Sequence, residues 1–245
     1  MKLKKYNNMI NEINIKELLN SIENRMKKLK TFEKEAGEDL NKVELDSIEV
    51  MNLILNLRMC LDWANNDIME KVDAEMLKHN TKRKKQNDYF PYKETEAELE
   101  KSIPQIKQYL PNVYGIISSI QYFDNNQHWL TNICKLTKNI KHKTKEEQVK
   151  ETSVAEINFA NHINLPVGGN SNIKISGNYV DGVKQENDVI IKNGKVESTD
   201  KLLRVIENAE FKFKESNIFI LKLLYTSYEG IKEFHRALYK ELNKI

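Results

Sequence analysis

The chain has 245 residues, of which 40% are apolar and 31% are charged, and 39 basic against 36 acidic residues leave a net charge of +3. This composition is typical of a globular protein with a sizeable core. It excludes a strongly basic protein that would bind nucleic acid over its whole surface, although local basic patches remain allowed.

The sequence predicts neither an export signal nor a membrane span. The N-terminal MKLKKYNNMINEI is positively charged but lacks the apolar segment of a signal peptide. No run approaches the roughly 18 consecutive apolar residues of a membrane span. Cys60 and Cys134 are isolated among apolar neighbours, which predicts two reduced, buried thiols rather than a disulfide or a zinc site. We therefore expect a cytoplasmic protein without metal, cofactor or membrane partner.

Two long helices are predicted in the N-terminal part. Apolar residues recur every three or four positions between Ile15 and Ala36, and Gly37 is a suitable C-terminal stop. A second helix is predicted over residues 38–77, and its centre, VMNLILNLRMCLDWA, is apolar on nearly every side. Such a helix is normally buried in a bundle. A polar group inside it is therefore informative, since it costs about 1–3 kcal/mol if it stays unpaired.

Arg58 and Asp62 are charged residues within this apolar helix, four positions apart. At this spacing they can form an intrahelical ion pair. In so apolar a helix, a buried network that reaches the facing helix is the alternative. A third interpretation is that Arg58 presents its planar guanidinium to a phosphate group.

Residues 78–93 interrupt the helical pattern with the polar segment KHNTKRKKQND, followed by the aromatic anchor YFPY. The basic run comprises Lys82, Arg83, Lys84 and Lys85. These four side chains are candidate nucleic-acid contacts, because cationic groups bind the phosphate backbone. A charged loop that is simply solvated is the alternative.

Shorter helices are predicted next, over residues 94–102, 105–110 and 112–122, and prolines separate the first segments. The sequence FDNNQ then indicates a turn. Asp124 or Asn125 is the predicted N-cap of the following helix, because Asp and Asn side chains accept hydrogen bonds from the first free backbone N–H groups.

The helix predicted over residues 126–143 has two distinct faces. Its apolar seam consists of Trp129, Ile133, Leu136 and Ile140. Its polar stripe consists of His128, Asn132, Lys135, Asn139 and His142. The helical rise separates the two histidines by about 21 Å, so they cannot share one metal ion or one proton. The candidate site is therefore the C-terminal end of the stripe, and a solvated helix face is the alternative.

The pattern changes after residue 143. A charged connector leads to period-two segments that predict a strand at 154–160 and hairpins at 173–198, where Asn-Gly indicates a tight turn. A further strand is predicted near 210–216, and a long helix at 217–244 closes the chain.

The predicted fold is α+β and mainly α. Residues 1–150 form a helical bundle, residues 151–216 form a small antiparallel β-rich insertion, and residues 217–245 form a C-terminal helix. Because the apolar face of this last helix needs a partner, we expect it to pack back on the bundle.

The order of four motifs resembles a group of uncharacterised bacterial helical proteins. The motifs are LRxxLD, FP, IQxY and a WLxxI…KH helix, and they span roughly residues 56–143. The matching positions are Leu57, Arg58, Leu61, Asp62, Phe90, Pro91, Ile120, Gln121, Tyr122, Trp129, Leu130, Lys141 and His142. The chain departs from the group at Trp63, where the group has His, and at Ile140, where it has Asp. The resemblance implies no known activity.

Lys138, Asn139 and His142 form a K-N-x-x-H pattern that is similar to the R-x4-6-H motif of HEPN domains. These domains are helical bundles, and many are ribonucleases of toxin–antitoxin and phage-defence systems. Lysine replaces arginine here and the spacing is one residue short. The resemblance implies that His142 performs acid–base chemistry at the RNA 2′-hydroxyl and that two sites meet in a homodimer. The implied catalytic set is His142, Lys138, Asn139, Arg58 and Asp62.

The sequence contains no P-loop, GxGxxG, HExxH or GxSxG motif. Strong helical patterning without a complete catalytic signature favours a non-catalytic interaction protein, from a bacterial or mobile-element setting, that binds a protein or RNA partner. A divergent HEPN-like ribonuclease with His142 as acid and base is the alternative. A nucleic-acid-binding module that uses residues 82–85 is the third hypothesis.

Overall fold

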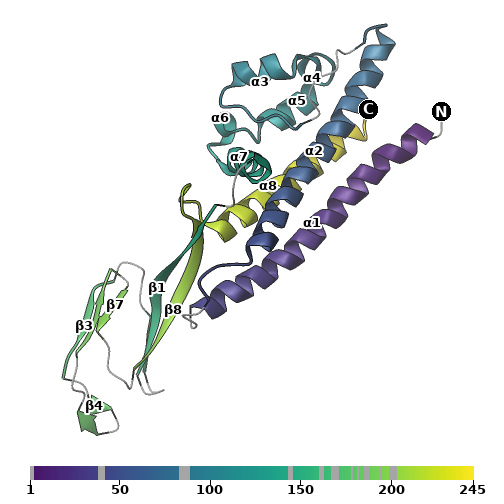
Figure 1. The fold of residues 1–245 in the computed structure, drawn as a ribbon. Coiled ribbons are helices and arrows are strands. Elements are labelled where there is room, and N and C mark those ends of the chain that lie inside the picture. The colour runs from purple at the N-terminus through teal and green to yellow at the C-terminus, as the bar shows by residue number, and fades with distance from the viewer. Residues whose placement is uncertain are drawn as a thin grey trace. The chain divides into compact units, whose positions relative to one another are not determined.

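The fold is known from a computed structural model, which describes residues 3–37, 42–82, 89–142, 146–159, 163–166, 171–177, 179–180, 182–184, 188–193, 195–198 and 203–245. Within these ranges the chain is α+β and mainly α, with a small antiparallel β region before the C-terminal helix, as the sequence predicts (Figure 1). Two compact units are present. The helical unit comprises Met1–Lys27, Ser47–Lys145 and Lys222–Ile245, and the β-rich unit comprises Lys28–Asp46 and Glu146–Leu221.

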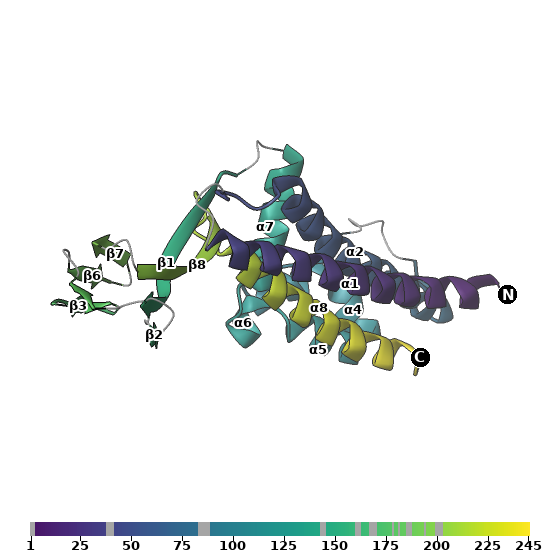
Figure 2. The same ribbon diagram turned by 90° about the horizontal axis from the view of Figure 1, so that it is seen from below.

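Three long helices provide the frame of the helical unit. They are α1 (Leu3–Ala36, of which the residues up to Lys27 belong to this unit), α2 (Ser47–Lys78) and α8 (Ile220–Leu242). In this unit they lie side by side in both views (Figures 1 and 2). Their predicted apolar faces are buried, with Ile15, Leu19, Ile22 and Met26 on α1, Leu53, Leu57, Leu61 and Ile68 on α2, and Leu224, Ile231, Phe234 and Leu238 on α8.

A buried polar cluster joins the three long helices. Asp67 of α2 is 2% exposed and accepts hydrogen bonds from Asn11 of α1, at 2.6 Å, and from the Tyr239 hydroxyl of α8. Burial raises the pKa of the Asp67 carboxyl, and the two hydrogen bonds oppose that rise. The cluster fixes how the three helices are positioned against one another, because a shift that removed these donors would leave a buried carboxylate without hydrogen bonds, at a large cost in free energy.

Five shorter helices complete the described part of the unit: α3 (Glu96–Ser102), α4 (Pro104–Tyr109), α5 (Pro111–Ser118), α6 (Tyr122–Asn125) and α7 (Trp129–His142). Pro104 and Pro111 occupy the first positions of α4 and α5, where a missing N–H costs nothing. Thr95 caps α3 by accepting a hydrogen bond from the Glu98 N–H.

The predicted N-cap at Asp124 or Asn125 is wrong, because both residues lie inside α6. Asn126 then adopts a left-handed conformation, with φ of 55°, and ends that helix. The Asn125 side chain is already engaged, since it donates to the Ser119 carbonyl and accepts from the Gln127 N–H. Helix α7 consequently begins three residues after the predicted start, at Trp129.

The second predicted helix also begins later than expected, at Ser47 rather than near residue 38. Of the intervening residues, 42–46 are described and are not helical. The Leu45 N–H donates to the Gln148 side-chain oxygen at 3.1 Å, and the Leu45 carbonyl accepts from the Gln148 amide nitrogen at 3.2 Å. Both backbone groups are thus used outside a helix, by a partner 103 residues away in sequence.

The β-rich unit is built on a three-stranded antiparallel sheet in the order β2 (Ile163–Pro166), β1 (Gln148–Phe159) and β8 (Leu203–Phe213). The β1–β8 register runs from Gln148 opposite Phe213 to Phe159 opposite Leu203, with a bulge between Val154 and Glu156. The predicted strand at 154–160 therefore starts earlier, at Gln148. Residues 148–153 of the charged connector thus pair with β8 instead of remaining a loop.

Two smaller antiparallel sheets follow among the residues of this unit that the structure describes. One contains β3 (Ile173–Ile175), β6 (Val189–Lys192) and β7 (Lys195–Ser198), and the other contains β4 (Tyr179–Val180) and β5 (Val183–Lys184). Asn193, at the predicted tight turn between β6 and β7, has a φ of 49°. This left-handed conformation is the one that an Asn-Gly hairpin turn requires.

Glu33, on the α1 segment of the β-rich unit, gives this unit an expected pH dependence. Burial raises the pKa of the Glu33 carboxyl to about 7, and the nearby Glu210 charge adds to the rise. The folded state therefore retains a proton that the unfolded state has released, so stability falls between pH 4.5 and about 7. We expect Glu33→Gln to flatten this fall and to stabilise the protein at pH 8 by roughly 1–2 kcal/mol, after allowance for partial exposure.

Urea unfolding at pH 5 and pH 8 measures the effect. Glu17→Gln, on an exposed position of the same helix, is the matched control and should leave the pH profile unchanged. If Glu33→Gln retained the full wild-type fall in stability from pH 5 to pH 8, the assignment to Glu33 would be wrong.

Candidate functional site

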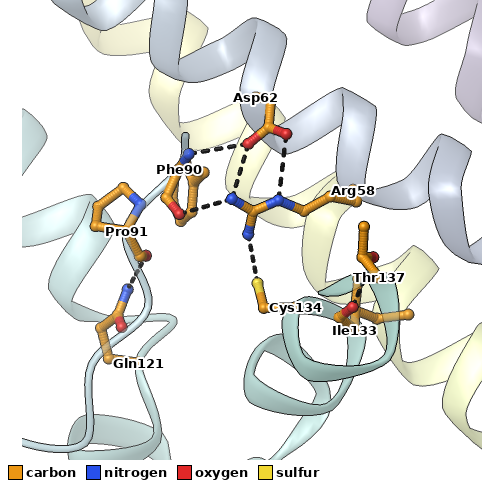
Figure 3. Close-up of polar contacts among 8 residues, drawn as sticks. All are labelled: Arg58, Asp62, Phe90, Pro91, Gln121, Ile133, Cys134 and Thr137. Atoms are coloured by element: carbon orange, nitrogen blue, oxygen red, sulfur yellow. Dashed lines mark hydrogen bonds and ion pairs between the residues drawn. The ribbon is translucent and has the colours of Figure 1, made fainter. Parts of the chain in front are cut away.

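The ion pair between Arg58 and Asp62 forms within α2, as one of the sequence alternatives predicts (Figure 3). Arg58 Nε lies 3.2 Å from one carboxylate oxygen of Asp62, and Arg58 Nη2 lies 2.9 Å from the other. Arg58 is only 7% exposed. A two-point contact of this kind fixes the plane of the guanidinium.

The pair extends into a buried network that reaches beyond α2. Arg58 Nη2 donates to the Phe90 carbonyl at 2.9 Å, and the Phe90 N–H donates to Asp62 at 2.9 Å. Arg58 Nη1 donates to the Cys134 sulfur of α7 at 2.5 Å. The helix α2, the segment at Phe90 and the helix α7 are therefore joined through one guanidinium (Figure 3).

Gln121 holds the same segment from its other side. Its side-chain oxygen accepts from the Lys93 N–H at 2.9 Å, and its amide nitrogen donates to the Pro91 carbonyl at 3.2 Å. The Gln121 side chain has no solvent exposure. Five residues of the bacterial-group motifs thus belong to connected contacts around one extended segment: Arg58, Asp62, Phe90, Pro91 and Gln121.

A cavity of about 580 Å³ lies beside this segment in the helical unit. Its lining residues come from α2, the 89–93 segment, the α3–α4 junction and α7. They are Arg58, Asn65, Met69, Tyr89, Phe90, Pro91, Tyr92, Lys93, Ser102, Ile103, Cys134, Thr137 and Lys138. The volume falls in the range of about 300–1,000 Å³ that is typical of small-ligand sites.

The charge of the cavity is positive. Its charged lining residues are Arg58, Lys93 and Lys138, and no carboxylate is among the lining residues that the structure describes. Asp62 neutralises Arg58. In the described part of the chain, the ammonium groups of Lys93 and Lys138 make no ion pair, so they supply the uncompensated charge.

The polar stripe of α7 lies mostly in solvent. His128 is exposed and stacks on Tyr122, with ring centroids 4.1 Å apart. Lys135 is exposed and its nitrogen lies 3.7 Å from a carboxylate oxygen of Glu94. Of the apolar seam, Trp129, Ile133 and Leu136 are buried, and Ile140 is half-buried. The side of α7 that carries Trp129 and Cys134, not the stripe, faces the rest of the unit.

The candidate catalytic set is only partly brought together. Arg58 and Asp62 are bonded to each other, and Lys138 lines the same cavity as Arg58. Asn139 is exposed and is not among the lining residues. His142 is the last residue of α7, and its side chain lies outside the described residues.

Of the four basic residues in the candidate nucleic-acid-binding loop, only Lys82 is among the described residues. Lys82 is exposed. Arg83, Lys84 and Lys85 lie outside the described residues. The cavity lysines belong to other elements, α7 and the segment that follows Phe90.

The sequence analysis did not select several residues that line the cavity, notably Lys93 and Thr137. It also did not predict that Cys134 accepts a hydrogen bond from Arg58. The available signal was the spacing of Thr131, Cys134 and Thr137, three residues apart on α7 and all buried. Thr137 satisfies its hydroxyl locally by donating to the Ile133 carbonyl at 2.7 Å. Both cysteines are free and buried, as expected, and burial raises the pKa of the Cys134 thiol to about 11.

The described residues contain no cluster of three or more His, Cys, Asp or Glu side chains with the arrangement of a metal site. Among the helices described, none combines the length and the apolar character that crossing a bilayer requires. No protein-family model matches the chain, and no curated protein or solved structure shows significant similarity to it.

Proposed function

We propose that the helical unit is an interaction module that binds single-stranded RNA and performs no chemistry of its own. The observation that carries this proposal is the cavity, in which Lys93 and Lys138, which have no ion-pair partner among the described residues, stand beside aromatic side chains. No carboxylate is among its described lining residues, so the electrostatic field at its opening attracts an anion.

RNA is the partner that matches this lining best. Lysines neutralise phosphate, and aromatic rings offer faces on which unstacked bases lie. Tyr89 is 63% exposed and Tyr92 is half-exposed at the same cavity. A cavity of 580 Å³ accommodates a nucleotide-sized group but not a duplex. Sequence-tolerant binding of single strands commonly combines these two kinds of contact.

The lining supports binding better than catalysis. General acid–base catalysis needs a group with a pKa near the working pH. The described lining residues include no histidine, and the Cys134 thiol, with a pKa raised to about 11, stays protonated. Arg58 is held in place by Asp62 and Phe90.

Charge reversal at the two lysines tests the proposal. We expect Lys93→Glu and Lys138→Glu each to weaken binding of a short single-stranded RNA about tenfold or more, because each removes one phosphate contact and adds repulsion. Fluorescence anisotropy over a series of salt concentrations measures the binding constant. In a plot of the logarithm of this constant against the logarithm of salt concentration, each variant should make the slope less steep by roughly 0.7.

Lys135→Glu is the matched control, since it makes the same charge change on α7 at a residue that does not line the cavity. If Lys135→Glu and Lys138→Glu lowered the RNA affinity equally, the loss would come from the change in net charge and not from a contact in the cavity. Absence of RNA binding by the wild-type protein would refute the proposal and would leave an acidic protein as the partner to test.

The ribonuclease is the second candidate function. One observation favours it: Lys138 lines the cavity, and His142 follows it by one helical turn on α7. Incubation of the purified protein with tRNA and mRNA separates the two candidates. Cleavage that His142→Ala abolishes, with an unchanged circular dichroism spectrum, would replace the non-catalytic proposal by this one.

A further inference from the structure

The guanidinium of Arg58 has one N–H group without an acceptor in the part of the chain that the structure describes. It carries five N–H groups. Asp62 takes the Nε hydrogen and one on Nη2, the Phe90 carbonyl takes the other on Nη2, and the Cys134 sulfur takes one on Nη1. Among the described residues, the second hydrogen on Nη1 has no acceptor, although Arg58 is only 7% exposed.

The acceptor that Nη1 does have is a poor one. A thiol sulfur accepts hydrogen bonds weakly, and the Cys134 thiol stays protonated because its burial disfavours the thiolate. Both Arg58 and Cys134 line the cavity. The Nη1 edge is therefore an under-satisfied cationic donor pair on a buried lining residue, and its surroundings are called the buried end of the cavity here. Tyr89 and Lys138 line the same cavity and are exposed.

We propose that this buried end receives a terminal phosphomonoester of the RNA strand, with a phosphoryl oxygen accepting from Arg58 Nη1. This inference rests on the proposed RNA binding and names the part of the strand that enters the cavity.

Geometry favours the end of a strand over its interior. An internal phosphodiester continues in two directions, so both neighbouring nucleotides would have to pass the opening to bring it to a residue that is 7% exposed. A terminal phosphate continues in one direction only. Its attached nucleoside can then extend outward past the aromatic side chains of Tyr89 and Tyr92.

Charge points the same way. A phosphomonoester carries about −1.5 to −2 charges at pH 7, whereas an internal phosphodiester carries one. Arg58 is already balanced by Asp62, so the uncompensated charges at the cavity are those of Lys93 and Lys138. Two cationic side chains beside an arginine donor match the doubly charged group more closely than the singly charged one.

Binding of matched oligoribonucleotides to the full chain tests the inference. One sequence is prepared with a 5′-phosphate, with a 3′-phosphate, or with hydroxyls at both ends, and each form is labelled at the base of an internal nucleotide. We expect at least one phosphorylated form to bind about tenfold more tightly than the hydroxyl form. The two phosphorylated forms identify which end is held.

The outcomes separate this inference from the proposed function. Equal affinity of all three forms, with binding still weakened by Lys138→Glu, overturns terminal-phosphate recognition and leaves RNA binding intact. Absence of binding by every form overturns both.

Cys134→Ser gives a second, independent readout. A hydroxyl is a stronger acceptor than a thiol, so it competes with the ligand for Nη1, and the affinity ratio of phosphorylated to hydroxyl RNA should fall severalfold. Cys134→Ala removes the competitor and should preserve or increase that ratio. Cys60→Ser, a change at the other buried thiol, is the control, because Cys60 is outside the cavity lining. Identical ratios in the Ser and Ala variants at Cys134 would overturn the role of Arg58 Nη1.

Discussion

Gly230→Ala is expected to destabilise the helical unit by about 2–3 kcal/mol, because there is no room for a methyl group between α7 and α8. A Cβ atom at Gly230 would lie 2.5 Å from Trp129 Cε2, 2.7 Å from Cζ2 and 2.9 Å from Nε1. The indole is 4% exposed and is held by its surroundings, so it cannot move aside cheaply. Chemical denaturation followed by circular dichroism measures the change.

Gly115→Ala is the matched control for this prediction. Gly115 also lies inside a helix, α5, but an added Cβ there meets nothing within 4 Å. We expect that variant to gain about 0.5–1 kcal/mol, the usual benefit of alanine over glycine in a helix. A second test is Trp129→Phe combined with Gly230→Ala. The smaller ring removes the atoms that clash, so the double variant should lose less than the sum of the single losses.

Arg58→Met is expected to cost about 3 kcal/mol, the lower end of the range for breaking a buried pair, since the Asp62 side chain keeps 22% exposure. The substitution leaves the Asp62 carboxylate without its counter-charge and the Phe90 carbonyl without its donor. Denaturation at pH 7 measures the loss. Arg58→Met/Asp62→Leu should recover part of it, because no uncompensated charge then remains.

The pair between Arg25 and Glu49 provides the control for burial. It has the same two-point geometry, at 2.6 and 2.7 Å, but its side chains are 25% and 28% exposed. We expect Arg25→Met to cost about 1 kcal/mol or less. Similar losses for the two arginine variants would show that burial is not what makes the Arg58 pair important.

The fold was predictable mainly where structure depends on local pattern. The apolar periodicity of α1, α7 and α8 indicates both the helices and the faces that they bury. The apolar centre of α2 indicates a buried helix, and the Asn-Gly turn indicates the β6–β7 hairpin. Two of the errors, the starts of α2 and of β1, arose at boundaries set by distant partners, whereas the wrong N-cap before α7 has a local cause in helix α6. The start of α2 depends on Gln148, and the extension of β1 depends on β8; neither contact is visible in a short window of sequence.

In the candidate site, too, contacts within one helix were predictable from the sequence and contacts between distant segments were not. The spacing of Arg58 and Asp62 indicated an intrahelical pair as one of three interpretations, because both lie on one helix. Their link to Cys134 joins residues 76 positions apart, and their link to Phe90 spans 28 to 32 positions. Periodicity also indicated the polar stripe of α7 as a candidate site, but that stripe is mostly solvated. The residue of α7 that contacts Arg58 is Cys134, on the buried side of the helix.

The extended segment from Phe90 to Lys93 bears on the rate at which a ligand would bind. Side chains of Arg58, Asp62 and Gln121 hold the N–H and carbonyl of Phe90, the carbonyl of Pro91 and the N–H of Lys93. One wall of the cavity therefore has its backbone ordered before any partner arrives. Little conformational entropy remains to be lost there on association, and no slow rearrangement of this segment should limit the association rate constant.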